Sequence, residues 1–543
     1  MRTRVDPITL EVARNALEGV ADEMNLALVR SSYSPNIKER RDCSSALFDE
    51  KGRMIAQSWG MPVHLGAMPF SVKAALQELK EPEPGDVIVL NDPFRGGAHL
   101  PDLTFITPIF HRDELVGYAA NRAHHADIGG MRPGSIPADA SEIYQEGLRI
   151  PPVKLRRRGR WDRDLLELIL ANVRTPKERL GDLRAQYAAN ETGRRRFLEL
   201  IERYGLERFR EIVDALLDYS EKRLRAALKA LKSGAYRFED ALDDDGRSAR
   251  DIRIRAAVTI DAERGEVRVD FTGSSPQVEG PINAVYAVTA SATYYAIRCF
   301  TDPGVPPNDG AYRPITIVAP EGTVVNAKPP AAVVGGNLEA SQRIVDVLIG
   351  ALAQAAPEKA PAACQGTMNN VALGGIDPRT GGPYTLYETI GGGFGARRGK
   401  DGLDGVHCHM SNTLNTPVEA LETAYPLRVE RYELRPGTGG RGRWRGGLGI
   451  RRDIRIVDHR ATLSLLTDRR RSRPYGLLGG GPGAPGQNVL IRDGEERELP
   501  AKGVIELEPG DVISIRTPGG GGYGPPEERD PKRDEEDRKE GKL

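Results

Sequence analysis

Residues 87–130 read VIVLNDPFRGGAHLPDLTFITPIFHRDELVGYAANRAHHADIGG. Three apolar runs in this stretch, at 87–90, 103–110 and 115–121, have the length and composition of β-strands. The polar HRDE between the last two runs is typical of a hairpin turn. These runs adjoin loops that carry histidine and aspartate, so the stretch predicts a β-sheet with polar side chains gathered at one edge.

Helices and further strands surround this sheet in the sequence. Apolar residues recur at helical spacing over 7–31, and amphipathic helical segments fill 162–232. After Gly234 the period shortens toward two, and from about residue 425 short strands alternate with glycine turns. We therefore expect a mixed α/β (α+β), multi-domain fold. The predicted regions are an α/β metal-site domain at 1–160, a helical region at 161–234, an α+β middle domain at 235–423, a β-rich domain at 424–525 and a disordered tail at 526–543.

Composition and charge argue against several classes of protein. The chain has 543 residues, too many for one ordinary core, and its 77 basic and 77 acidic residues give a net charge of zero. This balance argues against a nucleic-acid binder. The four cysteines form no CxxC pair, which fits a reducing cytosol rather than a disulfide framework. Because no apolar signal segment and no run of about 18 apolar residues occurs, we expect a cytoplasmic protein without membrane contact.

Six imidazole and carboxylate side chains lie where the first strands meet their loops. They are Asp92, His99, Asp102, His124, His125 and Asp127. Nitrogen and oxygen ligands without thiolate suit Mn, Fe or Zn, and His99, Asp102 and one histidine of the adjacent pair can supply three ligands. Adjacent residues on extended backbone point to opposite faces, so only one of the pair is expected to bind. The alternative is that these histidines cap loops and satisfy buried carbonyls.

A second polar group lies in GVHCHMSNTLNTPVEALE, residues 405–422. It contains His407, His409, Asn412, Asn415 and Glu419. The H-x-H spacing predicts two rings on one face of a strand, as a second metal site or a substrate-binding surface. The alternative is a polar interior loop that leads into a helix at Pro417.

The glycine-rich runs do not predict a nucleotide site. GGGFGARRGKDG, residues 391–402, has Phe394 where a phosphate loop requires glycine and Asp401 where it requires Ser or Thr. The runs at 479–486 and 518–524 are interpreted as turns between strands.

Eight motifs in order, spread over residues 5–525, resemble the hydantoinase B/oxoprolinase family. They are DPITLEVARNALEGVADEM, SPNIKERRDCSSALFD, MPVHLGAMPFSV, NDPFRGGAHLPDLT, NRAHHADIGGMRPGSIPADASEIYQEGLRIPPVKL, FTGSSPQVEGPINA, GGNLEASQRIVD and HMSNTLNTPVEALE. The resemblance implies a hydantoinase A-type partner that uses ATP to phosphorylate a small cyclic amide, in a hetero-oligomer. It also implies a divalent metal held by His99, Asp102 and His124.

Within this resemblance, His125, Asp127 and Asp92 are candidate catalytic residues, with His125 or Asp127 as general base. The five polar residues of 405–422 named above are candidates for substrate binding. The reaction is expected to be ATP-dependent hydrolysis of a hydantoin or 5-oxoproline. The alternatives are the α subunit of an acetone- or acetophenone-type carboxylase, and a non-catalytic structural subunit.

Overall fold

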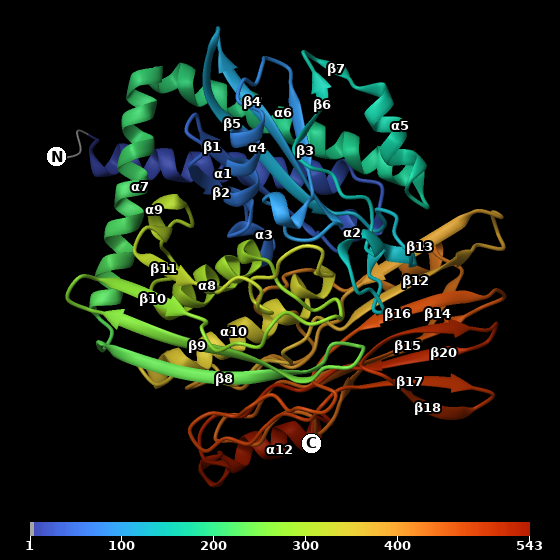
Figure 1. Cartoon of the computed structure of the whole chain (residues 1–543). Helices are drawn as coiled ribbons and strands as arrows, with labels where there is room; N and C mark the ends of the chain where they lie inside the picture. Colours follow the sequence, from blue (N-terminus) through green and yellow to red (C-terminus); the bar gives the residue numbers. More distant parts are fainter. Residues whose placement is uncertain (1–4) are drawn as a thin grey trace.

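The computed structural model describes residues 5–543, so the first four residues of the predicted 1–160 region lie outside it. A seven-stranded sheet occupies the N-terminal region, in the order β2-β1-β5-β4-β3-β6-β7 (Figure 1). Its strands are β1 (Cys43–Asp49), β2 (Met54–Gln57), β3 (Val87–Leu90), β4 (Asp102–His111), β5 (Glu114–His124), β6 (Val153–Arg157) and β7 (Arg160–Trp161). The predicted hairpin is confirmed, because β4 and β5 pair antiparallel with His111 opposite Glu114.

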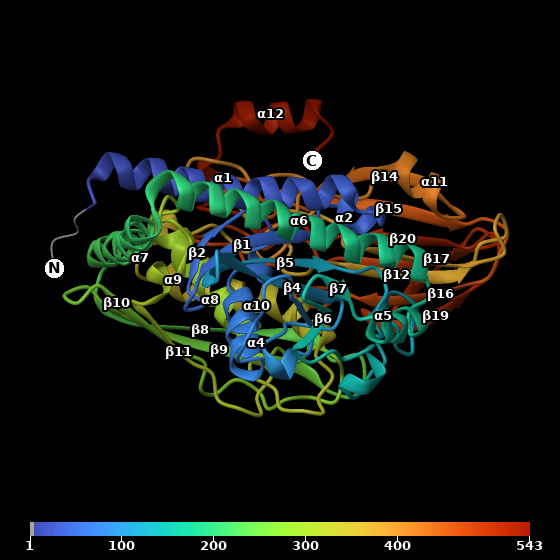
Figure 2. The same cartoon turned by 90° about the horizontal axis from the view of Figure 1, so that it is seen from above.

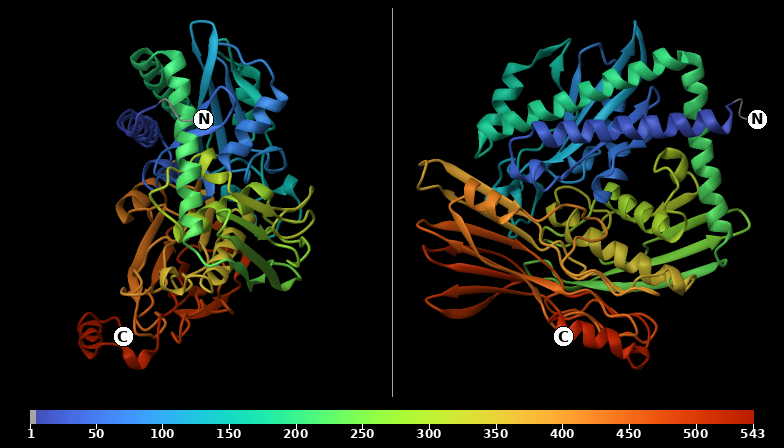
Figure 3. Two further views of the ribbon diagram at one scale, coloured as in Figure 1. Left: turned by 90° about the vertical axis from the view of Figure 1, so that its left-hand side faces the viewer. Right: turned by 180° about the vertical axis from the view of Figure 1, so that it is seen from behind.

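Helices cover both faces of this sheet, which explains why its strands are apolar on both sides. Along β1, Leu47 packs with α1 (Pro7–Ser31) and α6 (Pro176–Tyr204), whereas its neighbours Ala46 and Phe48 pack with α4 (Met68–Glu78). The long helices α1 and α6 run side by side (Figures 2 and 3). A Cβ on Gly193 of α6 would lie 2.4 Å from the sulfur of Met24 in α1, so glycine permits this close approach.

The remaining N-terminal helices are α2 (Pro35–Lys38), α3 (Pro62–Leu65), α5 (Arg163–Ala171) and α7 (Leu206–Lys229). The helical character predicted for 162–232 is therefore observed in α5, α6 and α7.

A second sheet follows, with the order β11-β10-β9-β8, and it packs against α8 and α10 (Figure 1). Its strands are β8 (Gly234–Asp244), β9 (Arg250–Asp261), β10 (Glu266–Asp270) and β11 (Ile315–Val318). The helices of this part are α8 (Tyr286–Phe300), α9 (Asp309–Tyr312) and α10 (Glu339–Leu352). Every residue of α10 is buried, so it forms the centre of this region rather than a surface layer.

Two further sheets complete the chain, and they differ from the predicted division at residue 423. One sheet has the order β13-β12-β16-β19 and joins strands from both sides of that boundary. Its strands are β12 (Asn370–Ile376), β13 (Pro383–Glu388), β16 (Ala461–Leu466) and β19 (Lys502–Leu507). The other has the order β14-β15-β20-β17-β18, with α11 (Val418–Ala424) preceding it. Its strands are β14 (Leu427–Arg435), β15 (Gly449–Ile456), β17 (Gln487–Arg492), β18 (Glu495–Leu499) and β20 (Val512–Arg516). Backbone pairing between β12 and β16 is long-range, which local sequence patterns do not report.

The structure places regular elements in the predicted disordered tail at 526–543. Residues 526–528 form a single 3-10 turn, and α12 (Pro531–Lys539) follows it, standing against the C-terminal region (Figure 3). The carboxylate of Asp537 pairs with Arg445 at 3.0 Å and with Arg529 at 2.5 Å. An ion pair to the buried Arg445 of the preceding region, together with a pair inside the segment, thus holds a segment that lacks an apolar pattern. In the part of the chain that the structure describes, no helix is long and apolar enough to span a membrane.

Candidate metal centre at the end of the β4–β5 hairpin

The hairpin itself brings two of the predicted ligands together. Asp102 is the first residue of β4 and His124 is the last residue of β5, and their Cα atoms are direct cross-strand partners. His99 lies one turn before β4, where its carbonyl accepts a hydrogen bond from the Asp102 amide at 3.1 Å. His99, Asp102 and His124 therefore converge at one end of the sheet.

Asp102 is held by groups on both of its oxygens. The imidazole of His64, on α3, lies with Nε2 3.1 Å from Oδ1, and the amide of Asn337 donates to Oδ2 at 3.3 Å. Because an ionised carboxylate can only accept, His64 donates from Nε2, and its Nδ1 then accepts from the Ser44 hydroxyl at 3.2 Å. His99 Nε2 lies 3.3 Å from Oδ2.

His99 and His124 each present one ring nitrogen without a hydrogen-bond partner. His99 contacts the carbonyl of Val334 through Nδ1 at 3.4 Å, and its Nε2 has no hydrogen-bond partner. His124 stacks on Tyr387 with ring centroids 4.3 Å apart, and its Nε2 is likewise unpartnered. The two histidine rings lie 5.0 Å apart, edge to face. Asn36 donates to the His124 carbonyl at 2.7 Å, with a weaker 3.3 Å contact to the ring Nδ1.

Burial and charge fix the protonation states. Burial raises the pKa of Asp102, but His64 and His99 outweigh burial and hold that pKa well below its usual range. Burial, together with the nearby His99, lowers the pKa of His124 well below its usual range. The centre therefore combines an ionised carboxylate with a neutral imidazole at neutral pH, which are the forms in which these groups bind metal.

The predicted catalytic residues lie around this cluster and hold its loops. His125 points away from His124, as expected for adjacent residues, and its Nε2 contacts Gln186 at 2.9 Å. Burial lowers the pKa of His125 to about 4. Both oxygens of Asp127 accept hydrogen bonds, including backbone amides and the Arg174 guanidinium at 2.8 Å. Asp92 caps the turn at 93–95 by accepting from the Phe94 amide at 3.0 Å. Their contacts are those of loop-stabilising residues.

The H-x-H residues do not share a face, and the prediction of a strand there is wrong. His407 contacts Ser411 through Nδ1 at 2.9 Å and Asn415 through Nε2 at 2.8 Å. His409 has a left-handed backbone with φ 52°, and its Nε2 lies 3.8 Å from Asp346. Burial lowers the pKa of both histidines to about 4. The backbone turns between the two rings, so they face different surroundings.

Two other predicted substrate residues of this segment are exposed. Asn412 donates its side-chain amide to the Gly60 carbonyl at 3.3 Å, and Glu419 lies on the outer side of α11. As predicted by the alternative interpretation, a helix follows Pro417. Within this segment, His407 and Asn415 bond to each other and the exposed pair does not join them.

Sequence reasoning missed several residues of the centre. They are Asn36, Asp42, His64, Asn337 and Tyr387, which come from α2, the residue before β1, α3, the segment before α10 and β13. A single histidine in a four-residue helix has no spacing partner that would mark it. The available signal was that His64 and Asn337 lie inside motifs that carried the family resemblance.

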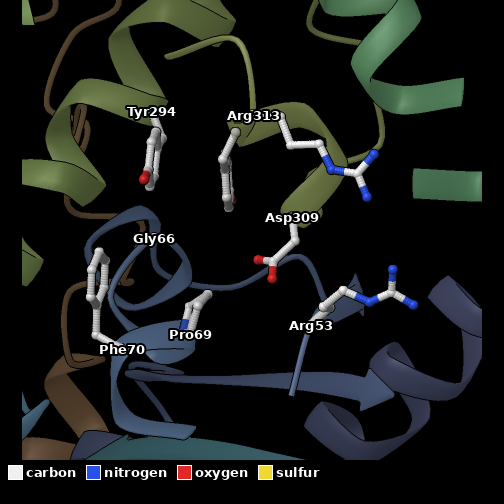
Figure 4. Close-up of a pocket in the computed structure, with 8 residues that line it drawn as sticks. Arg53, Gly66, Pro69, Phe70, Tyr294, Asp309 and Arg313 are labelled. Carbon is white, nitrogen blue, oxygen red and sulfur yellow. The ribbon is translucent and has the colours of Figure 1, made fainter. Parts of the chain in front are cut away.

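A surface hollow of about 320 Å³ lies apart from these residues. Phe70, Pro69 and Tyr294 lie on one side of it and Arg53 and Arg313 on the other, with Asp309 between them (Figure 4). None of the predicted site residues lines it. The candidate site is the buried cluster, where the ring nitrogens without hydrogen-bond partners and the ionised carboxylate meet.

The ligand types of His99, Asp102 and His124 fit a transition metal, although the three side chains are not close enough together to coordinate one ion. Two imidazoles and a carboxylate without thiolate suit Mn, Fe or Zn. Among residues 5–543, no three His, Cys, Asp or Glu side chains already stand close enough together to hold an ion. Binding of an ion by His99, Asp102 and His124 would require both rings to move closer to Asp102.

This fold and this cluster define the class of protein. The chain matches the hydantoinase B/oxoprolinase family over residues 6–526 and belongs to that family. It is 38% identical to the B subunit of a putative D-/L-hydantoinase from a Pseudomonas species, covering 98% of this chain and 92% of that protein. It is also 38% identical to 5-oxoprolinase 1 of Arabidopsis thaliana, covering 96% of this chain but only 42% of the plant protein.

Solved structures show the same fold. The ATP-dependent caprolactamase of Pseudomonas jessenii superposes with a TM-score of 0.93 at 34% identity, covering 99% of this chain and 94% of that one. A nucleotide-free acetone carboxylase superposes with a TM-score of 0.91 at 21% identity, covering 99% of this chain and 78% of that one. At that identity the second match shows the fold alone. The mixed α+β, multi-domain prediction is confirmed.

Proposed function

We propose that this chain is the B-type subunit of an ATP-dependent cyclic amidohydrolase that acts on a hydantoin or 5-oxoproline type of substrate. A hydantoinase A-type partner would phosphorylate the amide oxygen, and this chain would complete ring opening. The proposal is supported by the nearly full-length similarity to a protein named as the B subunit of a hydantoinase and by the similarity to a caprolactamase. Both of those names describe cyclic amide chemistry.

The observation that carries a metal role is the contact between His99 and Asp102. A carbonyl can only accept, so Nδ1 of His99 donates to the Val334 carbonyl. Nε2 of His99 lies 3.3 Å from Oδ2 of Asp102, and His99 is one of the two histidines that hold the pKa of this carboxyl low. A divalent cation could take over the positive charge that His99 contributes beside this carboxylate, and His124 would add a third ligand from the opposite strand.

The residues of this chain would divide the work as follows. His99, Asp102 and His124 would hold a divalent ion (Mn, Zn or Fe), which supplies Lewis acidity toward a carbonyl oxygen and water. His64 and Asn337 would orient the carboxylate. For His125, Asp127 and Asp92, we propose that they hold the ligand-bearing loops in place of the catalytic roles predicted from the sequence. His407 and Asn415 remain proposed substrate contacts.

The partner would supply the nucleotide chemistry. A cyclic amide is a poor electrophile, and phosphorylation of its oxygen creates a good leaving group. The sequence has no phosphate loop, so ATP use through a separate subunit in a cytoplasmic hetero-oligomer is consistent with the division of labour proposed here. Between hydrolase and carboxylase, the higher identity to caprolactamase than to acetone carboxylase favours hydrolysis.

The test is co-expression with a hydantoinase A-type subunit. ATP hydrolysis would be assayed with hydantoins, 5-oxoproline, and ketones plus bicarbonate, and metal content measured on the same sample. We expect turnover only with cyclic amides, and loss of both metal and turnover in His99→Ala. His111→Ala, which removes a histidine of the β4–β5 turn, is the matched control. Full activity of the His99 variant without bound metal would refute the assignment.

A further inference from the structure

Two glutamates, Glu146 and Glu339, are fully buried. Glu146 follows the short helix at 143–145 and Glu339 begins α10, and both are inaccessible to solvent. Within residues 5–543, each has one carboxyl oxygen, Oε2, without a hydrogen-bond partner, and only Glu339 has a cationic neighbour, Lys502, that acts on its pKa. Burial raises the pKa of Glu146 to about 8 and that of Glu339 to about 7. Burying a carboxyl group costs folding free energy, so an apolar residue would ordinarily occupy such a position in the core.

The bonded oxygen of Glu146 leads to His99. Oε1 accepts from the backbone amides of Val333 at 2.7 Å and Val334 at 2.9 Å. The carbonyl of that same Val334 is the group that contacts Nδ1 of His99 at 3.4 Å. The 3-10 turn at 334–336 that starts here also leads to Asn337, which donates to Asp102. One side chain therefore fixes the turn that orients one imidazole and one carboxylate of the centre.

The bonded oxygen of Glu339 leads to His124. Oε1 accepts from the side-chain amide of Asn370 at 2.7 Å and from the Met368 backbone amide at 3.1 Å. Oδ1 of Asn370 then accepts from the Tyr387 hydroxyl at 3.0 Å. The Tyr387 ring lies against His124 with an interplanar angle of 8°. A chain of two hydrogen bonds and one ring stack thus connects this carboxyl to the second imidazole.

We infer that Glu146 and Glu339 are positioning residues of the metal centre, each of which fixes the orientation of one of its two histidines. Glu146 acts through the Val334 turn and Glu339 through Asn370 and Tyr387. This inference rests on the proposed metal role of His99, Asp102 and His124. Because supports of this kind typically change metal affinity by about 10- to 100-fold, removal of either carboxyl should loosen binding by at least about tenfold.

The matched variants are Glu146→Met, Glu146→Gln, Glu339→Met and Glu339→Gln in the full chain. Methionine keeps the length of the side chain but lacks the acceptor, whereas glutamine keeps an acceptor oxygen at the same place. Each metal-free variant would be titrated calorimetrically with Mn²⁺ and with Zn²⁺. We expect the methionine variants to bind at least about tenfold more weakly and the glutamine variants to stay within about threefold of the wild type. Asp511→Asn is the control, because Asp511 is also buried but pairs with Arg492 in the C-terminal sheet.

A second measurement does not depend on metal. The chain has eight histidines, so ¹³C-labelled histidine can report the tautomer of each ring by NMR in metal-free protein. We expect the His99 signal to change in Glu146→Met and the His124 signal in Glu339→Met, each without the other. If Glu339→Met fails to fold, Tyr387→Phe removes the hydrogen bond from the Tyr387 hydroxyl to Asn370 while keeping the ring that stacks on His124. This variant should weaken metal binding in the same way.

The outcomes separate the two proposals. If the wild-type protein binds neither metal and the methionine variants still show the expected histidine changes, the metal role is refuted and the positioning inference stands. Methionine variants with wild-type metal affinity and unchanged His99 and His124 signals would overturn the positioning inference, whatever the metal result.

Discussion

Replacing His64 with leucine tests how the Asp102 carboxylate is held. The bond from His64 Nε2 to Asp102 Oδ1 is 3.1 Å long, and both side chains are almost inaccessible, at 1% and 0% exposure. A hydrogen bond to a charged group is worth about 1.5–3 kcal/mol. Breaking a fully buried ion pair costs more, about 3–5 kcal/mol. Because Asn337 still donates to Oδ2, we expect the lower range to apply.

This loss has two measurable consequences. For 543 residues, an unfolding entropy of about 2 cal/mol/K per residue converts about 2 kcal/mol into a fall of about 2 °C in the thermal midpoint. The same energy corresponds to roughly 30-fold weaker metal binding if the carboxylate is also released as a ligand. The two effects would be measured by scanning calorimetry and by metal titration of the same protein.

The direction in which stability changes with pH gives a further test of the contact between His64 and Asp102. His64 and His99 keep the pKa of Asp102 below its unfolded value, so the carboxylate contributes stability above that value, which is lost as pH falls through the folded pKa. Without His64 the depression is smaller, so acid destabilisation should begin at a higher pH in His64→Leu. His64→Gln can still donate and should restore most of the difference, while His111→Ala should behave as wild type. Unchanged midpoint, metal affinity and acid limb in His64→Leu would show that this bond does not hold Asp102.

Three further predictions concern stability. The buried carboxyl of Glu146 keeps its proton up to about pH 8, whereas the unfolded chain releases that proton near pH 4.5, so the free energy of unfolding falls as pH rises through this window, by on the order of 4 kcal/mol. Between pH 5 and pH 8, the thermal midpoint of Glu146→Gln should therefore fall less than that of wild type. The exposed Glu263→Gln is the control, and a slope for Glu146→Gln equal to that of wild type would contradict this prediction. Removing residues 526–543 deletes Asp537 and leaves Arg445, which is only 4% exposed, without this ion-pair partner. The thermal midpoint of the shortened chain should therefore be several degrees lower, and an unchanged midpoint would show that the tail does not contribute to stability. A Cβ on Gly393 would lie 2.1 Å from two backbone atoms, so Gly393→Ala should yield little soluble protein. A Cβ on Gly481 would have its nearest neighbour at 3.4 Å, so Gly481→Ala should express normally. Equal yields of the two variants would show that the backbone at Gly393 can shift.

Local patterns predicted the elements well. Apolar periodicity marked α1 over residues 7–31, and the structure has the same bounds, because one long amphipathic helix carries the same signal in every turn. The β4–β5 hairpin also followed from its sequence, since both strands and their turn are contiguous. By contrast, β12 pairs with β16 across the predicted boundary at 423, over about 90 residues, and no local signal encodes such pairing.

The site divides in the same way. Asp102 and His124 could be paired from the sequence, because the hairpin register places them opposite each other and His99 lies only one turn away. His64, Asn337 and Tyr387 could not, because they come from separate elements that meet only when the sheets and helices pack. Residue types and short spacings are properties of the chain alone. Which buried donor faces which acceptor depends on the packing of distant segments, and so do the charge states that make this a candidate metal centre.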